Sequence, residues 1–247
     1  MITLKTKADL NAMRECGDVM KSVLDFTSSI IKSGMTTLEL NDRIADYIRS
    51  FGATAPCLGY SGYPAETCIS IDDMVVHGIP SNQMIREGQI VSVDLVVGYK
   101  GFMTDAARTF KIGEVSDEKE KLVKVTEECF FKAIENLMDG TPLGNVGYAV
   151  QSHAEANGFS SVRALTGHGI GKNMHEDPSI PNYGRKGTGI RLKQGMTFCI
   201  EPMINAGTYD VKFMSDGWGV KTKDGKPSAH YENTVALTEN GLEILTL

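Results

Sequence analysis

Two segments of the chain, 106 residues apart, share one pattern of glycines and apolar residues. Each segment runs from one glycine to another, over residues 34–52 and 140–158, and carries apolar residues at four-residue spacing. The matched positions are Leu40, Ile44 and Ile48 in the first segment and Val146, Val150 and Ala154 in the second. A longer amphipathic stretch precedes each segment, roughly over 7–32 and 117–138. Each half therefore predicts a helix, a glycine turn and a second helix, which indicates an internal duplication. The alternative is a coincidence between two ordinary helix pairs.

Short runs rich in β-forming residues follow each predicted helix pair. They cover Thr67–Ile71, Ile90–Val97 and Phe102–Ile112 in the first half, and Arg163–Thr166, Met196–Ile204 and Ala229–Thr238 in the second. Helices segregated from antiparallel strands are typical of an α+β domain, in which the helices pack on one face of a sheet. No low-complexity stretch, charge block or linker interrupts the sequence, so we predict a single domain over residues 1–247.

Charge and composition exclude several classes of protein. The formal net charge of −6 repels a phosphate backbone, so a direct nucleic-acid function is not expected. The N-terminus lacks the pattern of a signal peptide, and no apolar run approaches the ~18 residues that span a bilayer. The five cysteines are odd in number and widely spaced, which argues against a disulfide framework or a thiolate zinc site and fits a reducing cytoplasm.

A predicted hairpin brings two aspartates together. The second predicted strand is followed by a glycine-bounded turn at 98–101, after which the chain returns. If the turn is centred between Tyr99 and Lys100, Asp94 faces Asp105 with Cβ atoms about 5 Å apart. Facing carboxylates in apolar surroundings are costly, so either one of them holds a proton or a cation lies between them. The alternative is a longer turn with a shifted register, in which both aspartates are solvated.

Two glutamates also lie inside apolar strands. Glu201 follows Thr197–Ile200 and precedes Pro202, and Glu232 lies within Ala229–Leu237. A glutamate in an apolar strand is costly unless it is paired. A single such residue is more often part of a structural ion pair or faces outward. Four acids in apolar strands, with few basic residues nearby in sequence, favour a shared cation site.

His168 lies in a predicted glycine-rich loop, between Gly167 and Gly169. Glycine lets the backbone turn sharply and lets another group approach closely. The four carboxylates of Asp94, Asp105, Glu201 and Glu232 balance two divalent cations and leave room for a water. Oxygen ligands with one imidazole suit Mn²⁺, Fe²⁺, Co²⁺ or Zn²⁺. Two such ions ~3.5–4 Å apart can activate one water and polarise a carbonyl together.

These residues, in this order and in these local settings, resemble the methionine aminopeptidases of the pita-bread fold. The resemblance covers essentially the whole chain. It is carried by Val76–Pro80 (VHGIP), Val93-Asp94, Thr104-Asp105, Thr166–Gly171 (TGHGIG), Ile200–Pro202 (IEP) and Tyr231-Glu232. Each motif alone is weak, but all of them in order are specific. The resemblance implies an antiparallel sheet covered by helices, with a pseudo-two-fold internal duplication.

The resemblance also implies roles for individual residues. The metal ligands would be Asp94, Asp105, His168, Glu201 and Glu232, with both aspartates and Glu232 shared or bridging. Glu201 would also shuttle a proton, while His77 and His175 match histidines that contact the substrate and the tetrahedral intermediate. The residues expected along the methionine side-chain pocket are Cys57, Tyr60, Tyr63, Cys68, Met174 and Trp218. Aromatic rings and thiols suit a flexible thioether, although such residues are also ordinary core residues.

The chain departs from the usual family pattern near two site residues. Met174 stands where phenylalanine is frequent, next to the second active-site histidine. His230 and Asn233 stand where glutamine and histidine are frequent, on either side of Glu232. The last two changes flank a ligand and can alter the groups that tune metal affinity. We expect them to affect metal preference and turnover and to leave the ligand set intact.

The function implied is that of a metalloexopeptidase that removes the N-terminal methionine from nascent proteins when the second residue is small. The short bacterial type I form is expected, because neither an N-terminal zinc-binding extension nor a long insertion in the second half is found. Expected partners are N-terminal methionine peptides and nascent chains, with a transient ribosome contact and no membrane, for a cytoplasmic monomer. The alternatives are a proline-specific peptidase of the same fold and a non-catalytic peptide-binding relative.

Overall fold

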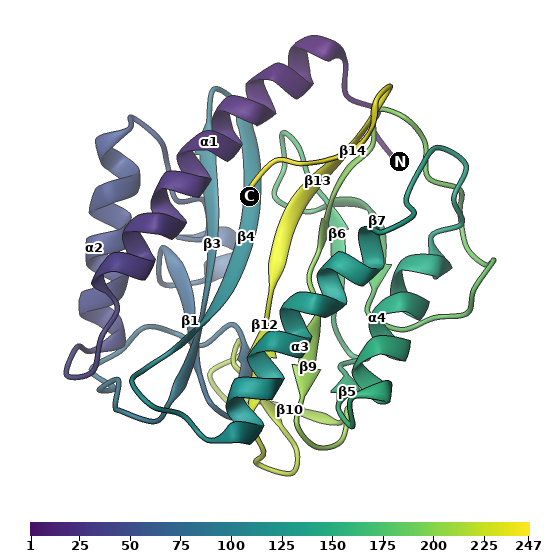
Figure 1. The fold of residues 1–247 in the computed structure, drawn as a ribbon. Helices are drawn as coiled ribbons and strands as arrows, with labels where there is room; N and C mark the ends of the chain where they lie inside the picture. Colours follow the sequence, from purple (N-terminus) through teal and green to yellow (C-terminus); the bar gives the residue numbers. More distant parts are fainter.

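Two helix pairs, one from each half of the chain, form the outer layer of the molecule (Figure 1). The computed structural model describes residues 1–247. The first pair is α1 (Lys7–Ile30) and α2 (Thr37–Ser50), and the second is α3 (Asp117–Ile134) and α4 (Gly144–Ala156). The six apolar residues that share the offset between the halves are all fully buried. The predicted duplication of a helix pair is therefore confirmed.

The first helix pair begins at well-formed caps. The side chains of Thr6 and Thr36 each accept a hydrogen bond from the backbone N–H three residues on, and an acidic side chain there returns a bond to the cap. Such capping boxes satisfy two of the free N–H groups at a helix start. Each cap contributes about 1 kcal/mol and fixes where its helix begins.

Strands from both halves form one eight-stranded antiparallel sheet. The order is β1 (Thr67–Ile71), β3 (Ile90–Tyr99), β4 (Phe102–Lys111), β13 (Glu232–Thr238), β8 (Thr197–Ile200), β6 (Thr166–Gly169) and β7 (Glu176–Pro181), with β14 (Gly241–Ile244) also paired to β13. The halves meet where Glu232 and Asn233 of β13 pair with Ala107 and Ala106 of β4. We call this β4–β13 pairing the seam. The predicted α+β class is confirmed.

Two smaller sheets and a short helix complete the fold. One sheet contains β10 (Val211–Phe213), β11 (Val220–Thr222) and β2 (Met74–Val76), and the other contains β12 (Ser228–His230), β9 (Met203–Asn205) and β5 (Ser160–Ser161). The short 3-10 helix η1 covers Tyr60–Gly62. Val76 of β2, Met203 of β9 and Tyr60 of η1 line one cavity.

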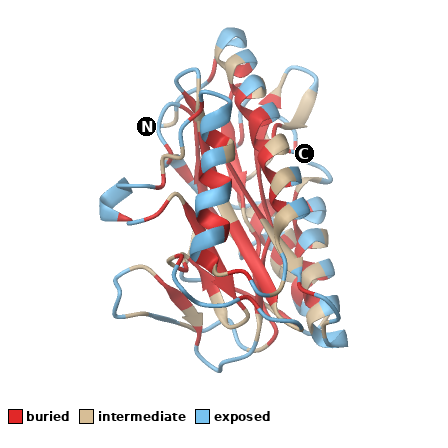
Figure 2. Ribbon diagram, turned by 90° about the vertical axis from the view of Figure 1, so that its left-hand side faces the viewer, coloured by how far each residue is buried: buried red, intermediate tan, exposed pale blue.

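The two faces of β3 have different roles. Val91, Val93 and Leu95 belong to the apolar cluster beneath α1 and α2. Successive side chains of a strand point to opposite faces, so Asp94 and Val96 point away from the helices. Both of these residues line a cavity. The helices thus bury one face of the sheet, as the side view shows (Figure 2), and the other face carries the site.

Three predicted strands differ from the structure. Arg163–Thr166 is mostly irregular, and the strand begins only at Thr166. The run Met196–Ile204 is interrupted at Glu201-Pro202 because proline has no N–H to donate to a strand partner. The run Ala229–Thr238 is divided at Tyr231 into β12 and β13.

The predicted loop around His168 is also wrong, because His168 lies within strand β6. The flanking glycines serve close strand packing. A Cβ at Gly167 would lie 2.3 Å from the carbonyl oxygen of Cys199, and one at Gly169 would lie 2.1 Å from that of Asp177. Only glycine, which has no Cβ, permits these contacts. A glycine-rich run is typical of a loop, whereas here the glycines let strand β6 pack closely against its neighbours.

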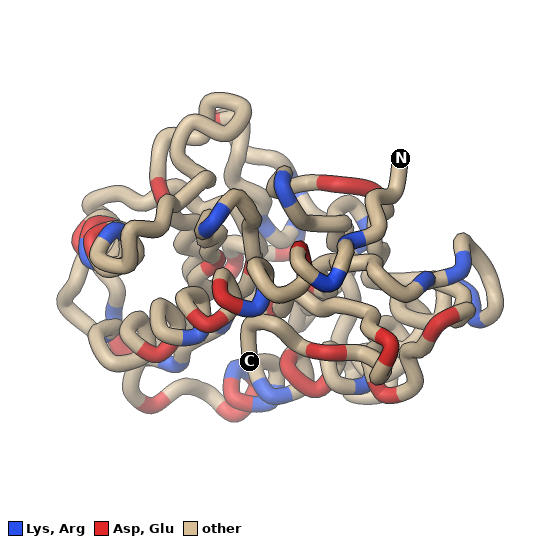
Figure 3. Tube along the Cα trace, turned by 90° about the horizontal axis from the view of Figure 1, so that it is seen from above, with Lys and Arg blue, Asp and Glu red and all other residues tan.

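The surface carries charges of both signs, and Lys and Arg are interspersed with Asp and Glu in the view from above (Figure 3). Several pairs lie within one helix, such as Lys21 with Asp18 at 2.8 Å and Arg49 with Asp46 at 2.7 Å. Exposed pairs of this kind contribute less than about 1 kcal/mol each. None of the helices has the length and apolar character needed to cross a bilayer.

Candidate metal centre and substrate pocket

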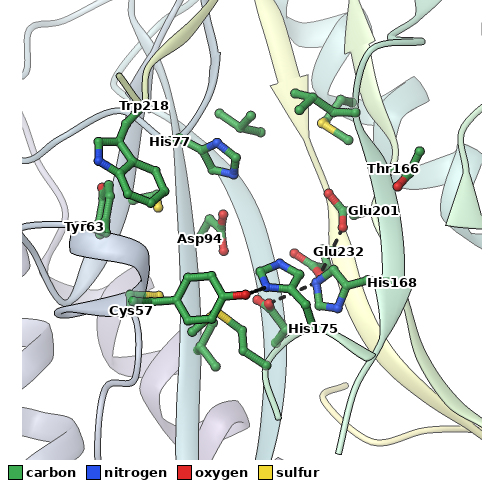
Figure 4. A pocket seen from close by; sticks show the side chains of 18 of the residues that line it. Cys57, Tyr63, His77, Asp94, Thr166, His168, His175, Glu201, Trp218 and Glu232 are labelled. Carbon is green, nitrogen blue, oxygen red and sulfur yellow. Dashed lines mark hydrogen bonds and ion pairs between the residues drawn. The ribbon is translucent and has the colours of Figure 1, made fainter. Parts of the chain in front are cut away.

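A cavity of about 320 Å³ brings together every residue predicted for the site. It is lined by Cys57, Tyr60, Tyr63, Cys68, Val76, His77, Asp94, Val96, Asp105, Ala164, Leu165, Thr166, His168, Met174, His175, Glu201, Met203, Trp218 and Glu232. Carboxylates and His168 lie at one end, and Trp218, Tyr63 and Cys57 lie at the other (Figure 4). The sequence did not predict Val76, Val96, Ala164, Leu165, Thr166 or Met203, which are apolar or small residues without a chemical signature.

The register of the β3–β4 hairpin differs from the prediction by two residues. Asp94 pairs with Ala107 and Asp105 pairs with Val96, so the aspartates are diagonal neighbours and not directly opposite. The reason is the turn, which is centred on Lys100 and Gly101, both at positive φ. Positive φ at both central residues is the pattern of a two-residue hairpin turn that matches the strand twist. A shift by two residues keeps both carboxylates on the same face.

Burial raises the pKa values of all four carboxyl groups. The pKa of Asp105 rises to about 7, mainly because the side chain is buried. Burial and the neighbouring Asp105 carboxylate raise the pKa of Asp94 well above its ordinary value. Burial and the two aspartates likewise raise the pKa of Glu201, and burial, Asp105 and Glu201 raise that of Glu232. The cluster therefore keeps protons at pH values at which exposed carboxyl groups are ionised, unless cations neutralise it.

The two glutamates enter the cavity from breaks in the strands. Glu201 comes directly after β8, and its backbone carbonyl accepts a hydrogen bond of 2.9 Å from Asn182. Glu232 is the first residue of β13 and lies at the seam. Only 2% of Glu232 and 5% of Asp105 are exposed to solvent. Two acids this deeply buried require partners.

His168 is oriented by its backbone contact. Its Nδ1 lies 2.9 Å from the carbonyl oxygen of Gly169 and donates to it. The lone pair of Nε2 then faces the carboxylates, at 3.6 Å from Asp105 Oδ2 and 3.8 Å from Glu201 Oε1. These separations exceed a hydrogen bond and suit donor atoms arranged around one ion. A backbone acceptor on the far nitrogen is the usual way to orient a ligating imidazole.

The donor set fits divalent cations. Asp105 Oδ1 and Glu232 Oε1 are buried and have no hydrogen-bond partner in the protein. Asp105, His168 and Glu232 lie in one group of potential ligands whose donor atoms are within 4.8 Å of one another, and Asp94 and Glu232 lie in a second such group. Carboxylate oxygens and a neutral imidazole suit ions such as Mn²⁺, Fe²⁺, Co²⁺ or Zn²⁺.

Two residues that were not predicted as ligands belong to these groups. Cys199 accompanies Asp105, and His230 accompanies Asp94. Burial, Glu232 and Asp105 raise the pKa of the Cys199 thiol far above its ordinary value. Cys199 does not line the cavity and packs in an apolar cluster with Met13 and Ala236, so it is not among the proposed ligands. Burial lowers the pKa of His230 to about 3, so its imidazole is neutral.

The opposite end of the cavity is apolar and rigid. Tyr63 and Trp218 pack edge to face, with ring centroids 5.0 Å apart. The Tyr63 hydroxyl lies 3.1 Å from two backbone carbonyl oxygens, those of Thr67 and Gly78, and donates to them. Tyr63 belongs to a small apolar cluster with Cys57, Cys68, Val96 and Met174. This end can accept one flexible apolar side chain.

Two further histidines flank the carboxylate cluster. His175 lies at the exposed mouth, where its Nδ1 is 2.7 Å from the Tyr60 hydroxyl. Burial of the ring and the neighbouring His168 lower the pKa of His175 to about 4. His77 adopts a left-handed backbone with φ of 58°, and burial lowers its pKa. Backbone strain of this kind costs about 1–3 kcal/mol and is typical of functional sites.

Comparison with known proteins identifies the family. The model for Metallopeptidase family M24 matches residues 11–239. The chain belongs to this family. A methionine aminopeptidase from Clostridium perfringens is 49% identical over 248 residues, which cover 100% of this chain and 99% of the relative. The crystal structure of methionine aminopeptidase from Rickettsia prowazekii superposes with a TM-score of 0.98 at 43% identity, covering 100% of both chains. Within M24 the chain therefore groups with the methionine aminopeptidases.

A second type of peptidase, a prolidase, has the same fold. The prolidase from Pyrococcus furiosus superposes with a TM-score of 0.79 at 22% identity, over 99% of this chain and 65% of the prolidase. At this identity the likeness shows the fold alone. It confirms that the curled antiparallel sheet with its helix pairs is the architecture common to both types.

Proposed function

We propose that this chain is a metal-dependent aminopeptidase that removes methionine from the N-terminus of proteins whose second residue is small. The observation that carries this proposal is a single cavity with a buried cluster of four carboxylates at one end and a rigid apolar wall at the other. The first end suits hydrolysis at a metal, and the second suits a thioether side chain. All 247 residues would act as a single catalytic domain, because both halves contribute to this cavity.

The proposed ligands are Asp94, Asp105, His168, Glu201 and Glu232. They would hold two divalent ions, drawn from Co²⁺, Mn²⁺, Fe²⁺ and Zn²⁺, with Glu232 shared because it belongs to both groups of potential ligands. Bound ions supply a water of lowered pKa and positive charge for the oxygen of the scissile carbonyl. Glu201 would hold a proton during hydrolysis and pass it to the leaving nitrogen, because its carboxylate faces the cavity near His168.

The neighbouring histidines would bind and orient the peptide. A neutral His175, fixed through Nδ1 by Tyr60, can direct Nε2–H at the oxygen that becomes negative. His77 lies between the carboxylates and Trp218 and is suited to contact the peptide beyond the scissile bond (Figure 4). Both rings remain neutral near pH 7 because burial lowers their pKa values.

The apolar end would select methionine. Tyr63, Trp218 and Met174 with the two thiols form a wall without charge, which can pack against a thioether but offers no partner to a charged side chain. The second residue of the substrate would leave the cavity beside His175 at its mouth. A bulky second residue would meet this rim, so small residues are preferred.

The cellular setting is part of the same proposal. Five free, buried cysteines fit the reducing cytoplasm. The substrates would be nascent chains that carry methionine, met through a transient contact with the ribosome, and the enzyme would act as a monomer.

The decisive experiment is peptide hydrolysis by metal-stripped protein with and without added Co²⁺ or Mn²⁺. We expect Met-Ala-Ser to be cleaved only with metal, and at least about tenfold faster than Met-Lys-Ser, since poor packing at a pocket mouth discriminates by this order. Preference for an Xaa-Pro peptide would favour the proline-specific alternative. Absence of divalent metal binding would favour a non-catalytic peptide-binding protein.

A further inference from the structure

His230 is a buried side chain without a partner beside the proposed metal ligands. It is the last residue of β12 and is 1% exposed. Neither of its ring nitrogens has a hydrogen-bond partner in the protein. Its backbone N–H and carbonyl are both bonded to the hydroxyl of Thr109 on β4, at 2.9 and 2.8 Å, so the strand pairing fixes where the ring lies. An unpartnered polar group this deeply buried is destabilising, which calls for a compensating ligand.

The ring points at the carboxylates of both glutamates. His230 Nε2 lies 3.8 Å from Glu232 Oε2 and 4.0 Å from Glu201 Oε2. These distances are too long for hydrogen bonds. They are close to the 3.6 and 3.8 Å that separate His168 Nε2 from Asp105 and Glu201. Two donor atoms that each lie about 2.0–2.2 Å from one ion are about 3–4 Å apart, so both histidines have the spacing of metal ligands.

We infer that His230 is a second imidazole ligand of the metal centre, on the side of Asp94. This inference rests on the proposed function and adds a residue to the proposed ligand set. The donor atoms of Asp94, His230 and Glu232 lie within 4.8 Å of one another, as do those of Asp105, His168 and Glu232. Each ion would then have at least one aspartate and one imidazole among its ligands, with Glu232 within reach of both ions.

A second imidazole changes the chemistry of the site and not its charge. A neutral imidazole adds no charge, so four carboxylates still balance two divalent cations. It adds a nitrogen donor on the Asp94 side of the centre. Nitrogen donors favour Fe²⁺, Co²⁺ and Zn²⁺ over Mn²⁺. We therefore expect His230 to bind the second ion more tightly and to shift the selectivity of that position away from Mn²⁺.

The test counts ligated imidazoles directly. Proton NMR of the Co²⁺-loaded protein, ¹⁵N-labelled at its histidine rings, resolves the strongly shifted N–H of each ligated imidazole. We expect two such resonances at two equivalents of Co²⁺, from His168 and His230. In His230→Gln we expect one resonance and at least about tenfold weaker binding of the second equivalent by calorimetry. His153→Gln is the matched control, because His153 contacts Glu128 on the helix layer at 2.8 Å and should leave both resonances in place.

The wild-type spectrum alone counts the ligated imidazoles, even if His230→Gln fails to fold. A single ligated imidazole in the wild type overturns the role of His230, and so do two resonances that survive in the variant. If such a protein still cleaves Met-Ala-Ser with Co²⁺, the proposed function stands without this ligand. A wild-type protein that binds no Co²⁺ overturns both.

Discussion

The guanidinium group of Arg108 donates a hydrogen bond of 2.6 Å to the backbone carbonyl of Glu232. It also donates to the side chain of Asn233 at 2.7 Å and to the carbonyl of Ala107 at 2.9 Å. The same group lies 4.3 Å from the centre of the Tyr231 ring. Arg108 therefore ties β4 to β13 at the seam, directly behind a proposed ligand, although it does not line the cavity.

Replacement of Arg108 should weaken both the fold and the metal centre. Arg108→Met leaves the Glu232 carbonyl without its donor, and each unsatisfied acceptor costs roughly 1–3 kcal/mol of unfolding free energy. Loosening of Glu232 should reduce metal affinity by about 10–100-fold. Urea denaturation and calorimetric metal titration measure the two effects. Arg191→Met is the control, because Arg191 donates to the Gly140 carbonyl from an exposed position. Equal effects of the two substitutions would show that the contact with Glu232 has no special role.

Asp94→Asn should separate stability from function. The variant loses a carboxylate of the proposed centre, so we expect metal binding and peptide cleavage to fall to background. Removal of one like charge from a buried cluster should at the same time stabilise the metal-free protein at pH 8. Thermal unfolding of metal-stripped samples, together with the peptide assay, tests both effects. A variant with normal turnover would end the proposal of a dinuclear site.

The metal-free protein should lose stability as the pH rises. The pKa of Asp105 is about 7 in the folded chain, above its ordinary value of 3.8, because the side chain is buried. The folded state therefore retains a proton that the unfolded state has lost. The contribution of Asp105 is complete below about pH 4 and is lost as the pH rises to about 7, with a slope of up to roughly 1.4 kcal/mol per pH unit. The raised pKa values of Asp94, Glu201 and Glu232 make the slope steeper.

Thermal unfolding of metal-stripped protein between pH 5 and 8 measures this slope. Asp105→Asn should make this slope less steep, and added Mn²⁺ should stabilise the protein more at pH 8 than at pH 5, because the ion competes with protons for the carboxylates. A metal-free wild type whose stability increased across this range would contradict the assignment of buried, protonated carboxyl groups.

Tyr60→Phe should reduce turnover with little change in stability. The hydroxyl that orients His175 is lost, while the ring remains at the exposed mouth of the cavity. A hydrogen bond of this kind contributes about 0.5–1.5 kcal/mol, so kcat should fall about 2- to 10-fold with a smaller change in KM. Tyr148→Phe, on exposed α4, is the matched control. A change in KM alone would mean that Tyr60 contacts the substrate and does not act through His175.

The sequence predicted the helix pairs because their signals are local. The apolar positions from Leu40 to Ile48 and the glycines at 34 and 52 that bound them lie within one short window. The β3–β4 register was predicted wrongly because it depends on which two residues form the turn. Lys100 has no obvious preference for positive φ, so the sequence offered no reason to centre the turn on Lys100-Gly101.

The position of His230 could not be predicted for a different reason. His230 differs from the usual family residue two positions before Glu232, and the sequence indicates no more than that. In the fold, its ring also approaches Glu201, which follows a different strand. Arg108 gave no signal at all, because its acceptors at Glu232 and Asn233 are brought to it only by the seam. Contacts between distant strands are set by the tertiary fold and have no local pattern.

The proposed ligands are divided unequally between the two duplicated halves that meet at the seam. The first half contributes Asp94 and Asp105 to the centre, and the second contributes His168, Glu201 and Glu232. A symmetric pair of identical halves would present matching side chains across the axis, yet here one copy provides only aspartates and the other an imidazole and glutamates. The paired helices still show the duplication, whereas the proposed ligands differ between the halves, so neither half alone would supply the full proposed metal centre.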